Sequence, residues 1–234
     1  MRIAVFSDIH GNIHALDAVL ADIDALRPDR VYCLGDLVGY GAFPNEVIAR
    51  IQERRVPTIM GNYDDGVGFE RAECGCAYKE ESDRQRGQQS LEWTKAHTSA
   101  EGKAFLRTLA PQIRLDADGK RLLLVHGSPR KINEYLFEDR PLSSFERLAR
   151  ASEADAIVFG HTHLPYTKTA AGVLFVNAGS VGKPKDGDPR ACYAVIDLSS
   201  AEPVTFRRVV YDVAAAAEAI RATDLPHQFA RDLY

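Results

Sequence analysis

Five short motifs in this sequence carry side chains that can bind metal ions. In chain order they are Asp8-Ile9-His10, Gly35-Asp36, Gly61-Asn62-Tyr63-Asp64, His126-Gly127 and Gly160-His161-Thr162-His163. They supply two aspartates from the first two motifs, one carboxamide and four imidazoles, with no thiolate among these ligands. Nitrogen and oxygen ligands of this kind suit divalent ions of intermediate hardness. The imidazoles can be neutral near pH 7, as metal binding requires, and the carboxylates are already ionised there.

The number of possible ligands points to more than one metal ion. A zinc-like ion takes about three or four ligands from a protein, so the larger set here fits two ions that share a bridging ligand. The expected ligands are Asp8, His10, Asp36, Asn62, His126, His161 and His163. Asp36 is the natural bridge, because a carboxylate between two dications offsets their repulsion and the preceding glycine allows close backbone approach. The sequence therefore predicts a dinuclear metal centre.

This ordered set of motifs resembles the calcineurin-like metallophosphoesterase superfamily, and most closely its small bacterial and archaeal phosphodiesterase-like branch. The resemblance runs from residue 3 to about residue 190 and includes residues 35–41, 177–182 and 186–190 outside the ligands. It implies a four-layer αββα sandwich, an α/β (α+β) fold in which two mixed β-sheets pack face to face with helices outside. It further implies that Asp8, His10, Asp36 and His163 hold one metal, and that Asp36, Asn62, His126 and His161 hold the other.

One position departs from the pattern of many family members. Their third motif has a histidine, proposed to protonate the leaving group, where this chain has Tyr63. A tyrosine pKa near 10 lies roughly three units above the optimum for acid catalysis at neutral pH, so proton donation by Tyr63 should be inefficient. The catalytic candidates are Asp36, Asn62, Tyr63 and Asp64. Asp64 either orients a metal-binding imidazole or stabilises a turn, and the sequence favours neither role.

The predicted site indicates a metal-dependent phosphoric ester hydrolase in which a metal-bridging hydroxide attacks phosphorus. A phosphodiesterase acting on small phosphodiesters, cyclic nucleotides or short nucleotides fits best, because the missing acid favours good leaving groups and the chain is compact. A phosphomonoesterase or a dinucleoside-polyphosphate hydrolase would use the same metal pair, and a non-catalytic protein-binding scaffold would share the fold. Mn, Fe, Zn, Ni and Co all suit the ligands, and Mn is favoured in vitro.

The composition is that of a soluble enzyme with one domain spanning residues 1–234. A net charge of −4 with both signs mixed argues against binding to nucleic acid or anionic membranes, so we expect a small phosphate-ester substrate. A homo-oligomer is compatible with the sequence. A signal peptide, a paired set of cysteines and an apolar run near ~20 residues are all missing from the sequence, which favours a cytoplasmic location. The spacing of Cys74-Gly75-Cys76 matches no zinc or thioredoxin motif and predicts a plain surface segment.

The elements that must position these motifs begin with strand–loop–helix units. Strands are expected at residues 3–6 and 31–34, each followed by a ligand-bearing loop and a helix, at residues 13–26 and 44–54. A third strand at residues 58–60 would deliver Gly61-Asn62. Consecutive units of this kind favour parallel strands with the ligands at their carboxyl ends.

The middle of the chain is predicted to be helical. Helices at residues 85–97 and 98–109, the second opened by a capping box from Thr98 to Glu101, would form a wall or small cap at about residues 85–110. The rest of the chain is predicted to be rich in hairpins. Its strands are expected at residues 113–115, 120–125, 156–159, 166–169, 173–176, 193–196 and 204–210, with helices at residues 141–151 and 214–222.

A parallel-leaning first half and a hairpin-rich second half together predict two sheets packed face to face. The polar end around His227-Gln228 is expected to carry no chemistry. Lys183, Lys185 and Arg190 follow the last glycine-rich loop and could meet substrate phosphate, but a solvated loop explains them equally well.

Overall fold

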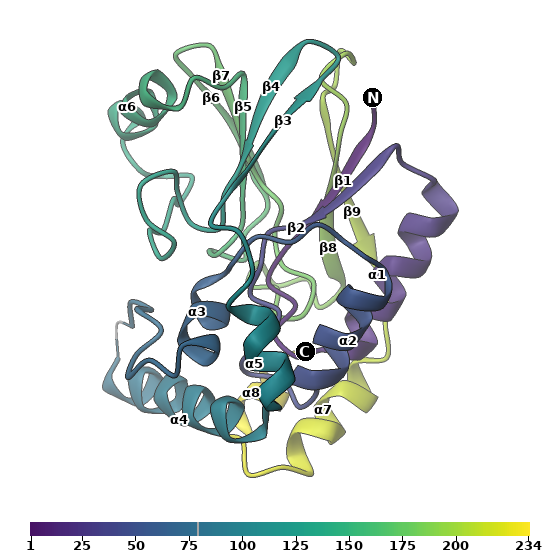
Figure 1. Cartoon of the computed structure of the whole chain (residues 1–234), viewed down its shortest axis with the longest axis vertical. Coiled ribbons are helices and arrows are strands. Elements are labelled where there is room, and N and C mark those ends of the chain that lie inside the picture. Colours follow the sequence, from purple (N-terminus) through teal and green to yellow (C-terminus); the bar gives the residue numbers. More distant parts are fainter. Residues whose placement is uncertain (79) are drawn as a thin grey trace.

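A computed structural model describes residues 1–78 and 80–234, and its strands form two mixed sheets (Figure 1). The first sheet contains β1 (Ile3–Phe6), β2 (Arg30–Cys33), β8 (Ala191–Ile196) and β9 (Val204–Val209), in the order β2-β1-β8-β9. The second contains β3 (Ile113–Ala117), β4 (Lys120–Leu124), β5 (Ala156–Phe159), β6 (Tyr166–Ala170) and β7 (Val173–Asn177), in the order β3-β4-β5-β7-β6.

The two sheets share a buried apolar layer. Ile3 and Val5 of β1 lie in one cluster with Leu122 and Leu124 of β4, and all four side chains are almost fully buried. Ala4 and Phe6 alternate with them along β1 and face the opposite side of the sheet, where helices cover them. Every residue of β1 is therefore buried, which explains why this strand is a continuous apolar run in the sequence.

Helices cover the outer face of each sheet. The helices α1 (Ile13–Leu26), α2 (Pro44–Glu53) and α7 (Val213–Arg221) belong to the cluster that covers the first sheet. The helix α6 (Leu142–Ser152) covers the second sheet, with Phe145 packed edge-on against Phe175 of β7. Figure 1 shows α6 and α1 on opposite sides of the pair of sheets. The predicted αββα sandwich is confirmed.

The sheets do not divide the chain into the two halves that the sequence suggested. The strands β8 and β9, from the end of the chain, join the first sheet beside β1, and β1 pairs parallel with β2 but antiparallel with β8. In the second sheet, β5 pairs parallel with both β4 and β7. The predicted third strand at residues 58–60 forms only isolated bridges, at Thr58 and Ile59, because the chain turns into a helix at Asn62.

A group of helices lies below the sheets in Figure 1. They are α3 (Asn62–Gly68), α4 (Glu81–His97), α5 (Ala100–Leu106) and α8 (Gln228–Arg231). The sequence did not indicate α3 or α8, and α4 begins four residues before the predicted residue 85. The predicted capping box at Thr98 is wrong, since the hydroxyl of Ser99 accepts the cap hydrogen bond from the backbone nitrogen of Gly102 at 2.9 Å. Thr98 instead donates to the Thr94 carbonyl and ends α4.

No helix within residues 1–78 and 80–234 is long and apolar enough to cross a membrane.

Candidate metal centre

The ligand-bearing motifs meet where four strands end. Asp8 and Asp36 follow β1 and β2, which are parallel neighbours in the first sheet. His126 and the loop around His161 follow β4 and β5, which are parallel neighbours in the second sheet. Since the carboxyl ends of parallel strands lie at one edge of a sheet, packing the two sheets brings all four loops together.

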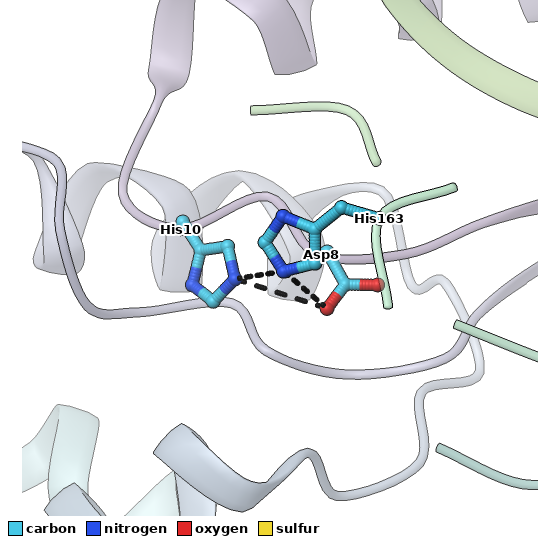
Figure 2. Close-up of side chains that lie close together, drawn as sticks. All are labelled: Asp8, His10 and His163. Atoms are coloured by element: carbon cyan, nitrogen blue, oxygen red, sulfur yellow. Dashed lines mark hydrogen bonds and ion pairs between the residues drawn. The ribbon is translucent and has the colours of Figure 1, made fainter. Parts of the chain in front are cut away.

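The first cluster consists of Asp8, His10 and His163, and Figure 2 shows their side chains converging. The Nε2 atoms of His10 and His163 are 3.1 Å apart, and Nε2 of His163 is 3.3 Å from Oδ1 of Asp8. These side chains are at most 4% exposed. Two imidazole nitrogens and a carboxylate oxygen thus face the same small space, as the ligands of one metal ion do.

The second cluster consists of Asp36, His126 and His161, with Asn62 beside it. The side-chain oxygen of Asn62 is 3.0 Å from Nε2 of His126. Oδ2 of Asp36 lies 3.4 Å from Nε2 of His126 and 3.7 Å from Nε2 of His10, which belongs to the first cluster. The Asp36 carboxylate is therefore located between the two clusters, where a bridging ligand would have to be.

Backbone carbonyls fix the orientation of three of the imidazoles. Nδ1 of His10 lies 3.0 Å from the Val38 oxygen, Nδ1 of His126 lies 2.8 Å from the Leu34 oxygen, and Nδ1 of His163 lies 2.6 Å from the Lys183 oxygen. A carbonyl can only accept, so each Nδ1 carries the hydrogen and each Nε2 faces the cluster. Histidine ligands of metals are usually held in this way.

Burial and charge set the protonation of these histidines. Burial lowers the pKa of His10 to about 4 and that of His161 to about 3, so both rings are neutral at pH 7. Burial alone would also lower the pKa of His126, but the carboxylates of Asp36 and Asp8 outweigh it and raise the pKa to about 10. His126 is therefore protonated at pH 7 in the metal-free protein, where both of its ring nitrogens face acceptors.

Two buried atoms of the site lack any hydrogen-bond partner within the described part of the chain, namely Oδ1 of Asp8 and Nε2 of His161. A buried polar atom without a partner destabilises a protein by about 1–3 kcal/mol. A divalent cation would satisfy a carboxylate oxygen and an imidazole nitrogen at once. The donors present therefore fit a pair of divalent metal ions, one at each cluster.

The backbone of the site is held in an unusual conformation. Asp8, His10, Asp36, His161 and His163 all have φ between 50° and 66°, a left-handed conformation that side chains other than glycine rarely adopt. Strain of this kind persists at functional sites because the surrounding structure enforces it. The glycine at position 61 lets the chain approach Asp36 closely, since a Cβ atom on residue 61 would lie only 2.2 Å from Oδ1 of Asp36.

Asp64 stabilises the turn that carries Asp36. Its buried carboxylate accepts hydrogen bonds from the backbone nitrogens of Asp36 at 2.8 Å, Leu37 at 2.9 Å and Gly61 at 2.9 Å. It has no hydrogen bond to an imidazole among the described residues. Of the two roles that the sequence left open for Asp64, these contacts support turn stabilisation.

Tyr63 lies in the core behind the metal ligands. Its side chain is 1% exposed, and its ring packs edge-on against His10, with 5.5 Å between the ring centres. Its hydroxyl faces the Gly87 carbonyl at 3.5 Å, and burial raises the pKa of Tyr63 well above its ordinary value. Both its position and its pKa oppose proton transfer from Tyr63 to a leaving group.

The Cys74-Gly75-Cys76 segment is a neighbour of the site that sequence reasoning missed. The side-chain nitrogen of Asn62 donates to the Cys74 carbonyl at 3.1 Å and to the Cys76 sulfur at 3.2 Å. The two sulfur atoms are partly buried and 3.0 Å apart. The prediction of a plain surface segment is wrong, because the spacing of two cysteines contains no signal that they fold back onto a metal ligand.

A match to a family model agrees with this geometry. Residues 1–201 match the calcineurin-like phosphoesterase superfamily domain. The match covers most of the chain and includes all the residues whose side chains converge at the site. The chain therefore belongs to the calcineurin-like phosphoesterase superfamily.

Several known proteins are similar over nearly their whole length. The uncharacterized protein MJ0912 of Methanocaldococcus jannaschii is 34% identical, with 99% of this chain and 97% of that protein aligned. Phosphodiesterase YfcE of Escherichia coli K12 is 26% identical over 84% of this chain and 88% of its own length. The crystal structure of a metallophosphoesterase from Sphaerobacter thermophilus matches with a TM-score of 0.79 and 30% identity, covering 100% of this chain and 98% of that one.

Proposed function

We propose that this protein is a phosphodiesterase that uses two divalent metal ions to hydrolyse small phosphodiesters or cyclic or short nucleotides. The observation that carries the proposal is the position of Asp36, whose carboxylate lies within 3.7 Å of imidazoles in both clusters. A bridging carboxylate is what a two-metal site requires. Two ions in this site would activate a water molecule and neutralise charge on the phosphate oxygens.

The residues of the chain would have distinct tasks in this reaction. Asp8, His10 and His163 would hold one ion and His126, His161 and Asn62 the other, with Asp36 shared between them. Two dications against the charges of Asp8 and Asp36 would leave about +2, which attracts a phosphate anion. None of the ring nitrogens bonded to backbone carbonyls needs to move a proton.

A preference for diesters with good leaving groups is expected, because Tyr63 is buried and does not supply a proton to the leaving group. The name of the similar phosphodiesterase YfcE supports the same choice. Phosphomonoesters and dinucleoside polyphosphates are the alternative substrates. The non-catalytic scaffold is less favoured, since all seven expected ligands are retained.

We further propose manganese as the first metal to test, a cytoplasmic location and a small-molecule substrate.

The test compares hydrolysis of bis-p-nitrophenyl phosphate and p-nitrophenyl phosphate, with manganese or with a chelator. We expect faster turnover of the diester, loss of turnover with the chelator, and at least a hundredfold loss in Asp36→Asn, since removing an electrostatic catalytic group has effects of about this size. Faster turnover of the monoester would favour a phosphomonoesterase. Absence of turnover with every metal tested would favour the scaffold.

A further inference from the structure

A cavity of about 490 Å³ lies beside the metal ligands. Thr162, between His161 and His163, forms part of its lining, so the cavity reaches the loop that supplies a ligand to each cluster. The helix α4 contributes Arg86 and Gly87 to it. A substrate whose phosphate binds at the clusters could place one of its ester groups in this cavity.

Aromatic rings form much of the cavity wall. They belong to Tyr40, Tyr78, Tyr135, Phe137 and Phe229. The ring of Tyr135 lies against that of His161, tilted by 37° with 4.0 Å between centres, and the ring of Phe137 is nearly parallel to that of Tyr135. The C-terminal helix α8 supplies Phe229, which packs against Tyr40, so the prediction that the end of the chain carries no chemistry overlooked a wall of this cavity.

Of the cations that line the cavity, two are already neutralised. Arg86 forms an ion pair with Asp83, and the ammonium group of Lys183 lies 2.8 Å from a carboxylate oxygen of Asp232. The ammonium of Lys183 also lies 5.4 Å from the centre of the Tyr40 ring, which fixes it against the wall. Neither group is free to bind a substrate without breaking an existing contact.

Lys185 differs from these two cations. Its side chain lines the cavity, and within the described residues its ammonium has no ion-pair or hydrogen-bond partner. The backbone nitrogen of Lys185 lies 3.4 Å from the His163 carbonyl, so this lysine is tied to the loop of a metal ligand.

We propose that Lys185 is a catalytic residue that contacts the leaving-group oxygen, and that the aromatic cavity holds the leaving group. The proposal rests on the proposed phosphodiesterase function. As water adds to phosphorus, the bond from phosphorus to the ester oxygen breaks and the electron pair stays on that oxygen. The Lys185 ammonium donates a hydrogen bond to it and offsets its charge, and the attacking water supplies, through solvent, the proton that the released alcohol takes up.

The test is the dependence of rate on the leaving group. Lys185→Met is compared with the wild-type protein on aryl phosphodiesters whose phenols span a range of pKa, and kcat/KM is measured for each. We expect a loss of about tenfold or less for p-nitrophenyl esters and about a hundredfold for phenyl esters, because a poorer leaving group develops more charge that needs stabilising. Lys185→Arg should restore most of the rate, since it keeps the charge.

Lys120→Met is the matched control, because Lys120 is an exposed lysine at the start of β4 and is not part of the loop that carries Lys185. It should leave the whole series unchanged, and the manganese content of all variants should equal that of the wild type. An equal loss across the series, or no loss, would overturn the role of Lys185 while leaving the diesterase intact. A wild-type protein without chelator-sensitive turnover would instead remove the function on which the proposal rests.

Discussion

The Cys76 sulfur lies 3.2 Å from the side-chain nitrogen of Asn62, and this contact determines which way the Asn62 amide faces. The same nitrogen donates to the Cys74 carbonyl at 3.1 Å, so the amide oxygen is turned toward His126. The Cys74-Gly75-Cys76 segment, which contains no expected metal ligand, therefore orients the expected ligand Asn62. Groups of this kind, which hold the ligands rather than the metal, commonly alter metal affinity or activity by about 10–100-fold when they are changed.

This relationship predicts that Asn62→Asp is harmful even though a carboxylate is a stronger metal ligand than an amide. The new oxygen would face the Cys74 carbonyl oxygen and could not donate to it. We expect kcat/KM on bis-p-nitrophenyl phosphate to fall by about 10–100-fold. Cys76→Ser, which keeps an acceptor, should stay within about threefold of the wild type. An Asn62→Asp variant as active as the wild type would show that amide orientation does not matter.

Gly61 is predicted to tolerate no side chain. In Gly61→Ala the new methyl group would lie 2.2 Å from both the backbone nitrogen and Oδ1 of Asp36, so Asp36 must move. We expect loss of manganese binding, measured by metal analysis after gel filtration, together with a lower melting temperature. Gly119→Ala is the control, since Gly119 has open space around its Cβ position and only its positive φ of 75° disfavours a side chain. It should bind metal normally and lose only about 1 kcal/mol of stability.

Glu134 gives a prediction about pH. Its carboxylate accepts hydrogen bonds from Ser128, Arg130 and Arg140 beside the aromatic wall. Burial alone would raise the pKa of Glu134, but these bonds outweigh it and lower the pKa to about 2. A carboxyl whose pKa is lower in the folded state stabilises the protein above its unfolded pKa of about 4.5, and this stabilisation is lost as the pH falls toward 2.

Glu134→Gln should therefore be less stable than the wild type by about 1 kcal/mol at pH 7, a modest value because Arg130 is largely exposed. The difference should shrink between pH 5 and pH 3. Denaturant unfolding of both proteins with a chelator present measures it free of metal effects. A difference that stayed constant over this range would mean that the ionised carboxylate is not what stabilises the loop.

Tyr63 should be dispensable for proton transfer. Tyr63→Phe removes only a hydroxyl that faces the Gly87 carbonyl at 3.5 Å, so we expect kcat on bis-p-nitrophenyl phosphate to change by less than about threefold. A Tyr63→His variant should gain nothing on alkyl esters, because position 63 packs against His10 rather than lining the cavity. A marked gain in Tyr63→His would show that this side chain can reach the substrate after all.

Metal binding should stabilise the fold. Manganese at about 100 times its dissociation constant adds about 2.7 kcal/mol, which raises the melting temperature by about 5–10 °C for a chain of this length. The reason lies in Oδ1 of Asp8 and Nε2 of His161, which lack partners in the described residues until a cation binds. His161→Ala should reduce the shift. Equal melting temperatures with manganese and with chelator would contradict the assignment of these atoms as ligands.

Local patterns predicted the parts of this protein that depend on neighbouring residues. Apolar runs before Asp8, Asp36, His126 and His161 correctly gave the strands β1, β2, β4 and β5. The strands β1 and β5 are buried throughout, and β2 and β4 are buried at their carboxyl-terminal ends, so the residues nearest the site read as continuous apolar segments. The hairpins β3-β4 and β6-β7 followed from their turn residues. Together with the motifs, these patterns were enough to place the site.

Features that depend on distant partners could not be predicted in this way. The pairing of β1 with β8 joins the two ends of the chain, and neither strand contains a local signal for its neighbour. The cavity wall made by Phe229 and the contact of Cys76 with Asn62 are of the same kind. The cap at Ser99 was missed by a single residue, since Thr98 offers the same chemistry and only the tertiary course of the chain selects between them.

The division of the ligands between the sheets bears on when this site can form during synthesis. Asp8, His10 and Asp36 follow strands of the first sheet, whereas His126, His161 and His163 follow strands of the second. The strand β8, which completes the packing of β1, lies beyond all of these residues in the chain. We therefore expect the two halves of the site to meet, and any metal to bind, only after nearly the whole protein has been synthesised.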